Sequence, residues 1–438
     1  MNAVIIAIAV MLILSLLRIN VVLSLVLGAF AGGLTSGMGI SKTVETFTEG
    51  LGAGATIALS YGLLGGFAIA ISKTGIPELM IASILKLLNK NGASNKQGLV
   101  KALIFFLIFA MAVFSQNLIP IHIAFIPLLI PPILKILNML EVDRRIISTI
   151  IAVGLVGTYS FVPSGFGSIF QEIIATQVTK AGMEVSVSDV PIAMAIPVLG
   201  MLIGLVVALF FYRKPRRYEE AGVETSPLEL KVSKRVIIST IIALLAALYT
   251  QITTDSMIVG AFAGITIMYV TGALKWREAD EVLTDGMRMM SFIGFVMIAA
   301  NGFASVINAT GDIDSLINSS LSILEGNTSL AVLVMLIIGL IVTMGIGSSF
   351  ATIPIIATLF VPLSVELGLS PLAIMCLIGT AGALGDAGSP ASDTTLGPTA
   401  GLNVDGQHNH IWDTCVPTFI FVNIPLIIFG WIACVFFL

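Results

Sequence analysis

The sequence predicts an all-α polytopic membrane protein, and three observations support this prediction. Of the 438 residues, 57% are hydrophobic and only 11% are charged, whereas a soluble domain is about 25% charged. Apolar runs of about 15–23 residues recur from end to end, the length that a helix needs to cross a bilayer. Glycine, proline and polar residues interrupt several of these runs, so parts of the backbone should line a polar cavity rather than face lipid. We therefore expect a multi-pass protein of the cell membrane.

Composition and motifs also exclude several functional classes. The three cysteines, Cys376, Cys415 and Cys434, stand in or beside apolar runs without metal-ligand spacing, which argues against a transition-metal site. The chain has no HExxH motif and no phosphate loop, so we expect neither enzyme activity nor a cofactor. We expect no nucleic-acid partner either. The apolar run at 3–17 has no preceding Lys or Arg and is expected to be a retained helix.

Short motifs recur in the same order in two parts of the chain. Gly-Ala-Phe-Ala-Gly at 28–32 recurs at 260–264, and Thr48-Glu49-Gly50 matches Thr284-Asp285-Gly286. Further matches follow along both parts, which indicates two homologous halves. We place the halves at 1–212 and 236–438, joined by a charged linker at 213–235.

The distribution of Lys and Arg predicts the orientation of the halves. The linker carries seven of the 21 Lys and Arg residues, so it should lie in the cytoplasm. Counting spans from there puts the loops at 86–101 and 138–145 inside and both termini outside. The first half then starts outside and the second inside, which predicts two inverted structural repeats.

Each half contains a pair of apolar arms around a polar tip. In the first half the arms span about 102–135 around Ser115-Gln116-Asn117, and in the second about 330–364 around 345–349. The first arm, about 102–114, is shorter than the roughly 20 residues of a full span. We therefore expect re-entrant hairpins. The alternative is two ordinary helix pairs in which Ser and Gly serve helix packing.

Each half also contains an apolar helix that glycine and proline interrupt. The first is expected at about 146–180, broken around Pro163, and the second at about 371–403, broken at 385–395. Half-helix N-termini attract carboxylates, while unwound carbonyls and carboxylates coordinate Na⁺. Only the second break contains acids, Asp386 and Asp393. Ionisable residues within the membrane are functional-site candidates by default.

The Gly-Asp-Ala-Gly-Ser-Pro-Ala-Ser-Asp-Thr-Thr stretch at 385–395 and Ser-Gln-Asn at 115–117 resemble the NhaC-type Na⁺/H⁺ antiporter family of the ion transporter superfamily. That family includes members that move amino acids and organic acids. The resemblance covers essentially the whole chain and is specific for architecture rather than substrate. It implies a site lined by the following residues: Ser115, Asn117, Ser348, Ser349, Asp386, Ser389 and Asp393.

Two sets of candidate site residues follow from these observations. The hairpin tips and the breaks should bind substrate, through Ser115, Gln116, Asn117, Ser164, Gly165, Gly347, Ser348, Ser349 and Ser389. The coupling ion should be held by Asp386, Asp393, Asn117, Ser392 and Thr394. His122 is a candidate for a proton-linked group, with a hydrogen-bonded core histidine as the alternative.

The function that these expectations favour is ion-coupled secondary active transport. The chain would move a small polar metabolite, an amino acid, together with Na⁺ or H⁺ across the lipid bilayer by alternating access, with an elevator-type movement as one form of it. The alternative is a Na⁺/H⁺ antiporter without an organic substrate, and the sequence does not decide between the two. A channel and a membrane-embedded enzyme fit less well. A homodimer is left open.

Overall fold

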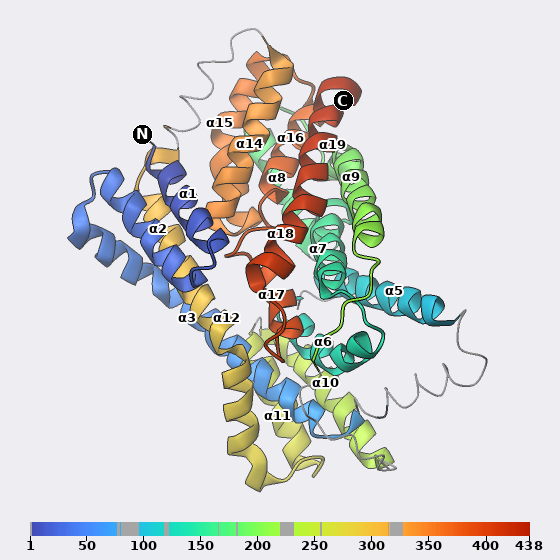
Figure 1. Ribbon diagram of the computed structural model, residues 1–438. Coiled ribbons are helices and arrows are strands. Elements are labelled where there is room, and N and C mark those ends of the chain that lie inside the picture. Colours follow the sequence, from blue (N-terminus) through green and yellow to red (C-terminus); the bar gives the residue numbers. More distant parts are fainter. Residues whose placement is uncertain are drawn as a thin grey trace.

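The computed structural model describes residues 2–76, 79, 96–117, 122–164, 166–180, 183–219, 232–254, 256–313, 315 and 327–438, and its regular elements there are all helices (Figure 1). Seven of the described helices are long and apolar enough to cross a membrane. The number rises to eight if the bent pair α7 and α8 forms one span. The predicted all-α membrane class is confirmed.

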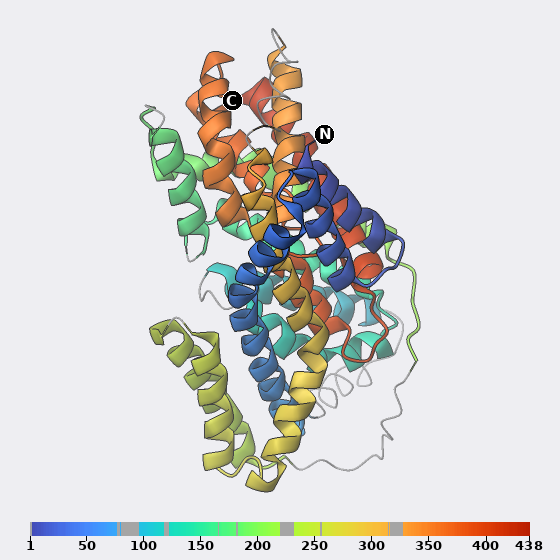
Figure 2. The ribbon, with the colours of Figure 1, turned by 90° about the vertical axis from the view of Figure 1, so that its left-hand side faces the viewer.

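One set of helices is called here the α3–α12 group. Its two long helices, α3 and α12, lie against each other over most of their length (Figure 2). Glycines allow this close approach, since a Cβ atom on Gly286 would stand 2.0 Å from the backbone nitrogen of Gly66. The α1–α2 pair packs on α12, and the α10–α11 pair packs on α3. The members are α1 (Ala3–Leu16), α2 (Val21–Thr35), α3 (Gly39–Ser72), α10 (Lys234–Thr254), α11 (Met257–Val270) and α12 (Ala279–Ala309).

The two copies of the Gly-Ala-Phe-Ala-Gly motif make matching contacts in this group. A Cβ atom on the first glycine of each copy would lie 2.8 Å from a carbonyl of the preceding helix, Ala7 for Gly28 and Ala247 for Gly260. Each motif also packs on a phenylalanine of the other half, because Gly28 meets Phe303 and Gly264 meets Phe67. This correspondence supports the sequence repeat, while the inverted orientation of the halves stays a prediction.

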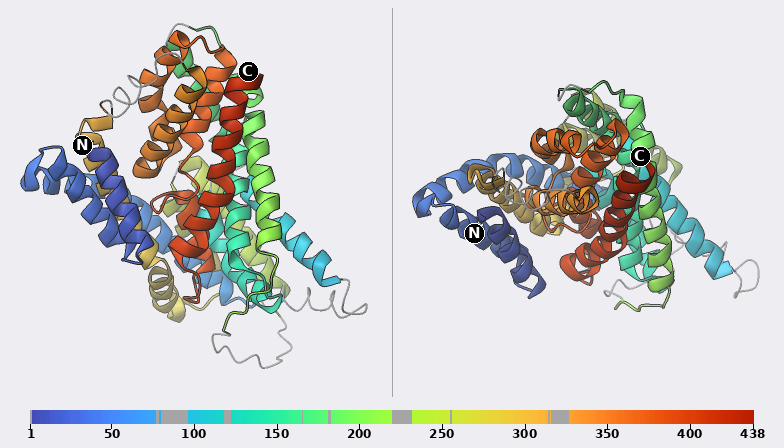
Figure 3. Two further views of the ribbon diagram at one scale, coloured as in Figure 1. Left: turned by 45° about the horizontal axis from the view of Figure 1, so that its top comes forward. Right: turned by 90° about the horizontal axis from the view of Figure 1, so that it is seen from above.

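The second set, called here the α7–α16 group, lies beside the first when the molecule is seen from above (Figure 3). Its central helices are α7 and α16, in which the residues from 146 to 160 and from 373 to 383 are all buried. The members are α5 (Lys96–Asn117), α6 (His122–Met139), α7 (Arg144–Phe161), α8 (Phe166–Lys180), α9 (Val190–Phe211), α14 (Thr328–Ile346), α15 (Ser349–Glu366), α16 (Pro371–Ala383) and α17 (Asp393–Leu402). The broken helices therefore form the core of the molecule.

The C-terminal helical run lies against α9 and includes three π-helical stretches. Its parts are His410–Cys415, α18 (Val416–Thr418), Phe419–Asn423, α19 (Ile424–Ile432) and Ala433–Phe437, and short 3₁₀ turns span Val187–Asp189 and Trp276–Glu278. Both chain termini lie at the upper end of Figure 1, opposite the start of the linker.

The first hairpin arm differs from its prediction. Helix α5 begins at Lys96 and continues for 22 residues through Asn117, so it includes Lys96 and Lys101, which were expected in a loop. Its segment from Gly98 to Ser115 is long enough to cross a membrane. The polar residues at 115–117 close the helix instead of forming an unwound tip, because no glycine or proline interrupts the run from 99 to 117. Residues 118–121 lie outside the described part of the chain.

The second helix pair agrees closely with the predicted bounds. Helices α14 and α15 are separated only by Gly347, whose φ is +76°, and by the extended Ser348. A glycine suits this position because the left-handed conformation is costly for other residues. Helix α14 is itself long enough to cross a membrane, so re-entrance stays a prediction.

Candidate ion and substrate site

The site is built on the unwound stretch at 384–392, which separates α16 from α17. Gly385 and Gly388 have φ angles of +91° and +90°. A Cβ atom on Gly385 would come within 2.7 Å of the backbone nitrogen of Met344, and one on Gly388 within 2.8 Å of Cβ of Phe419. The helix therefore ends where two glycines take left-handed conformations against α14 and the C-terminal run.

Side chains from neighbouring elements satisfy the carbonyls that the break sets free. The carbonyl of Ala387 accepts a hydrogen bond from the Asn423 amide, and that of Pro390 accepts one from Nε2 of His410 at 2.9 Å. The hydroxyl of Thr395 donates to the carbonyl of Ser389 at 2.5 Å. An unwound segment at membrane depth requires such partners because lipid offers none.

Asp386 is a buried carboxylate at the start of this stretch and is 6% exposed. The hydroxyl of Tyr159 donates to its Oδ2 at 2.5 Å. Tyr159 stands on α7 just before the break at 162–165, where α7 and α8 are bent by 49°. The breaks of the two halves therefore meet at this hydrogen bond.

Ser349, the first residue of α15, brings the tip of the α14–α15 pair to the same place. Its hydroxyl and backbone amide lie close to the Asp386 carboxylate. The hydroxyl is buried and faces the Asp386 carboxylate and the Tyr159 hydroxyl. The tip also contacts the break through Gly347, where a Cβ atom would lie 3.0 Å from the carbonyl oxygen of Ala391.

Asp393 is the second acid of the stretch and the first residue of α17, which Ser392 caps. Its Oδ1 is buried without a partner among the described residues, and it lies near enough to Asp386 for the two charges to repel each other. Tyr61 of α3 approaches Asp393 from the other helix group, and its buried hydroxyl also lacks a partner in the described part of the chain. Buried polar atoms without partners suggest a place for a ligand, an ion or water.

The structure gathers most, but not all, of the predicted site residues. Those placed in the break or at the α14–α15 tip are Gly347, Ser348, Ser349, Asp386, Ser389, Ser392, Asp393 and Thr394. Ser164 lies in the first break and is half-buried, and no hydrogen bond joins its side chain to Asp386 in the described residues. The hydroxyl of Ser115 donates to Ala112 within its own helix. The side chains of Gln116, Asn117 and His122, and the whole of Gly165, lie outside the described residues.

Four buried polar residues on the elements that form or border the site were not selected from the sequence. They are Tyr61, Tyr159, Gln171 and Asn423. Gln171 of α8 buries both polar atoms of its amide without a partner among the described residues, next to Phe170, whose ring packs 4.9 Å from that of Tyr159. The sequence indicated them only weakly. Each is a polar residue inside an apolar run, but an apolar run does not show which side of its helix faces the break.

A buried arginine joins the far ends of the two central broken helices. Arg144 begins α7, is fully buried, and donates to the carbonyl of Leu402 at the end of α17 at 2.8 Å. It also donates to both carboxylate oxygens of Asp405 and to Asn138. Burial alone would raise the pKa of Asp405, but the hydrogen bonds and charge of Arg144 outweigh it and hold that pKa below its ordinary value. The linker adds ion pairs from Arg216 to Asp413 and from Arg217 to Glu141.

Comparison with known proteins gives the family context. Residues 150–431 match the model of the Na⁺/H⁺ antiporter family, and residues 2–88 match a second model described as a Na⁺-H⁺ antiporter family. The "Putative amino acid transporter YuiF" of Bacillus subtilis is 52% identical over 99% of both chains. An uncharacterized membrane protein of Vibrio parahaemolyticus is 51% identical over the same shares.

Two solved transporter structures show a distant likeness. The YdaH transporter of Alcanivorax borkumensis is 14% identical, with a TM-score of 0.41 over 88% of this chain and 85% of that one. MtrF of Neisseria gonorrhoeae is 16% identical, with a TM-score of 0.39 over 89% of this chain and 83% of that one. The family matches and the full-length relatives show that this chain is a multi-pass membrane protein that belongs to the Na⁺/H⁺ antiporter family.

Proposed function

We propose that the protein is an ion-coupled secondary transporter of a small polar metabolite, an amino acid, and not an enzyme. The observation that carries the proposal is the buried Asp386, which stands in an unwound segment where the breaks of both halves and the α14–α15 tip converge. Broken helices that meet in a buried polar centre are typical of secondary transporters. The bilayer is the only further partner that the proposal needs.

The coupling ion would bind between Asp386 and Asp393. Two neighbouring buried carboxylates repel each other, and a cation or a shared proton relieves this repulsion. Oδ1 of Asp393, which has no partner among the described residues, and the buried hydroxyl of Ser349 supply oxygen atoms that suit Na⁺. Binding of the ion would reduce the negative charge of the centre, which lowers the cost of moving it relative to the α3–α12 group.

The substrate would bind beside the ion. Gly347, Ser348, Ser349 and Ser389 border the break and offer backbone and hydroxyl groups, and the buried amide of Gln171 offers both a donor and an acceptor. A polar molecule with several hydrogen-bonding groups could satisfy these atoms. The name of the Bacillus subtilis relative supports an amino acid as the substrate class.

The second candidate is Na⁺/H⁺ exchange without an organic substrate. The family descriptions favour it, and so does the pair of neighbouring carboxylates, which could hold either a proton or Na⁺. In this case Gln171 and the hairpin tip would serve only to shape the ion site.

Transport by purified protein in liposomes separates the two candidates. We expect uptake of at least one member of a panel of radiolabelled amino acids to rise above the external concentration when an inward Na⁺ or H⁺ gradient is imposed. A pH-sensitive dye inside the same liposomes reports proton movement when Na⁺ is added without amino acid. Proton movement with Na⁺ alone and no uptake of any amino acid would contradict the first candidate and support the second.

A further inference from the structure

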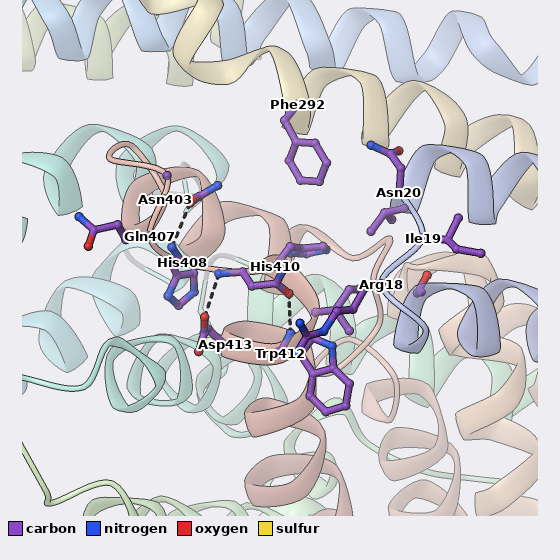
Figure 4. A pocket seen from close by; sticks show the side chains of 15 residues that line it. Arg18, Ile19, Asn20, Phe292, Asn403, Gln407, His408, His410, Trp412 and Asp413 are labelled. Carbon is purple, nitrogen blue, oxygen red and sulfur yellow. Dashed lines mark hydrogen bonds between the residues drawn. The ribbon is translucent and has the colours of Figure 1, made fainter. Parts of the chain in front are cut away.

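A pocket of about 480 Å³ opens on the face of the molecule that carries the linker, apart from the site around Asp386 (Figure 4). Its walls come from both helix groups. The connection between α1 and α2, with Arg18 and Asn20, forms one side, and Phe292 of α12 lies over it. The segment from Asn403 to Asp413 forms the other side. Relative movement of the two groups would therefore change its shape.

Arg18 has a left-handed backbone conformation, which is costly for an arginine. It follows the end of α1 with a φ of +65°, and the left-handed region costs a residue other than glycine roughly 1–2 kcal/mol. Glycine or asparagine would take this turn at a lower cost. The exposed guanidinium forms no hydrogen bond and no ion pair with any described residue. The arginine side chain therefore makes no polar contact that would stabilise the described part of the fold. Its charged group remains available to a ligand in the pocket.

Three asparagines of the pocket present their amide nitrogens rather than their oxygens. The side-chain oxygen of each accepts a backbone N–H: Asn20 from Val22 at 2.9 Å, Asn403 from His408 at 3.1 Å, and Asn409 from Trp412 at 2.9 Å. A backbone N–H needs an acceptor, which fixes the orientation of each amide. The three NH₂ groups form no hydrogen bond with the described residues and remain available as donors.

The acceptors of the pocket, in contrast, are occupied. The carboxylate of Asp413 accepts from Arg216 at 2.7 Å and from the backbone of Asn409 at 2.9 Å. Gln407 is bonded to Glu219 through both its oxygen and its nitrogen. His408 is 2% exposed, and its Nδ1 lines the pocket without a partner among the described residues. Burial lowers the pKa of His408 to about 3, so the ring is neutral at pH 7. Among the described residues, the free groups are therefore one cation, three amide donors, the buried hydroxyl of Ser15 and one neutral imidazole nitrogen.

We propose that this pocket binds the carboxylate of a small organic molecule through Arg18, with the amides of the lining asparagines as further hydrogen-bond donors to the bound molecule. A guanidinium and several N–H donors are the groups that recognise a carboxylate, and the guanidinium can bind it with two parallel hydrogen bonds. Phe292 and Trp412 supply apolar surface for the rest of the molecule. The inference rests on the proposed function. It adds that the transported substrate carries a carboxylate and that this carboxylate first binds in the pocket beside the linker.

The side chain of His410 lies between the pocket and the unwound stretch at 384–392. His410 lines the pocket, and its Nε2 donates to the carbonyl of Pro390, next to Ser389. The other ring nitrogen lies 2.8 Å from the hydroxyl of Thr399 on α17. A carboxylate bound here would thus stand at the entrance to the ion and substrate site, with His410 between the two.

Fluorescence of Trp412 tests binding without any need for transport. The chain has three tryptophans, so Trp276→Phe with Trp431→Phe leaves Trp412 as the only one. We expect acetate and L-alanine to change its emission saturably, and acetamide and L-alaninamide to have no effect. Arg18→Asn should weaken carboxylate binding about tenfold, because a charged hydrogen-bonding group is lost. Arg18→Lys should weaken it less.

Saturation-transfer NMR with acetate on the full chain with all tryptophans repeats the measurement if the tryptophan substitutions disturb folding. Acetate binding that is equal in Arg18→Asn and in the unsubstituted protein would overturn the proposal, as would equal binding of acetate and acetamide. Saturation by inorganic phosphate but not by acetate would overturn it in favour of a phosphate group, such as a lipid headgroup.

Thermal unfolding separates a binding role of Arg18 from a structural one. Arg18→Asn relieves the strained backbone, so its thermal midpoint should stay the same or rise. A lower midpoint with unchanged acetate binding would show that the arginine is structural and would overturn the proposal. Saturable acetate binding in a protein that accumulates no amino acid would instead contradict the proposed function and leave the carboxylate pocket standing.

Discussion

Replacing Arg144 should destabilise the protein strongly, because its guanidinium is fully buried and is the only cation among the described residues that pairs with the Asp405 carboxylate. Its side chain forms four hydrogen bonds, to the Leu402 carbonyl, to both oxygens of Asp405 and to Asn138. The Asp405 side chain is only 13% exposed. Arg144→Met removes the cation and leaves this carboxylate largely buried, and breaking a buried pair in this way costs about 3–5 kcal/mol.

The assay is the free energy of unfolding in mixed micelles, measured for single and double variants. Arg144→Met should lose about 3–5 kcal/mol, whereas Arg144→Met with Asp405→Leu should recover part of the loss, since it leaves no buried charge unpaired although Leu402 and Asn138 still lose their donor. The control is Arg277→Met, because Arg277 is exposed and forms no ion pair among the described residues. A loss below about 1 kcal/mol in Arg144→Met would refute the reasoning, because that is the size expected of a surface pair.

Three further predictions concern Asp405, Tyr159 and Gly385. The stability difference between the unsubstituted protein and Arg144→Met should shrink as the pH falls, because Arg144 holds the pKa of Asp405 below its ordinary value while burial without that cation raises it in the variant, whose carboxyl therefore takes up a proton first; a difference that grows on acidification would contradict the pairing. Tyr159→Phe removes the hydrogen bond from the tyrosine hydroxyl to Asp386 and should change the apparent affinity for the coupling ion at least about tenfold in uptake assays; equal affinities would show that this bond does not act on the ion site. Gly385→Ala should lower the thermal midpoint more than Gly406→Ala, since both have φ near +74° to +91° but only Gly385 has a backbone atom within 3 Å of the added carbon; equal losses would mean that the contact with Met344 is not tight.

The membrane class and the broken second helix could be predicted because both depend on local sequence. Apolar length defines the spans, and the close spacing of Gly385, Gly388 and Pro390 within six residues interrupts the helix. The turn at Gly347 was predictable for the same reason. In these places the composition of a few neighbouring residues decides the backbone.

The first hairpin arm was predicted too short because the cationic residues at its start were assigned to a loop. Lys96 and Lys101 are compatible with helix, and long basic side chains at a helix end can extend toward the membrane surface. The positive-inside argument counts charges near the ends of spans, but it does not say whether those charges stand within the helix.

The partners of Asp386 could not be predicted because they come from distant parts of the chain. Tyr159 lies 227 residues away in sequence, and Tyr61 belongs to the other helix group. Which face of α7 or α3 meets the break depends on how the helices pack, and neither helix has a marked polar face. The same holds for Arg144 and Asp405, which are 261 residues apart.

Concentrative uptake by Asp386→Asn in proteoliposomes tests the central claim most directly. The substitution keeps the size and much of the hydrogen bonding of the side chain but removes its charge and its proton, so the ion loses the largest electrostatic attraction in the site. Asp280→Asn is the matched control, because Asp280 is exposed on the first turn of α12. We predict that Asp386→Asn abolishes gradient-driven accumulation while Asp280→Asn retains it, and that Asp393→Asn has a smaller effect than Asp386→Asn. Accumulation by Asp386→Asn with the ion dependence of the unsubstituted protein would contradict the claim that this carboxylate couples transport to the ion.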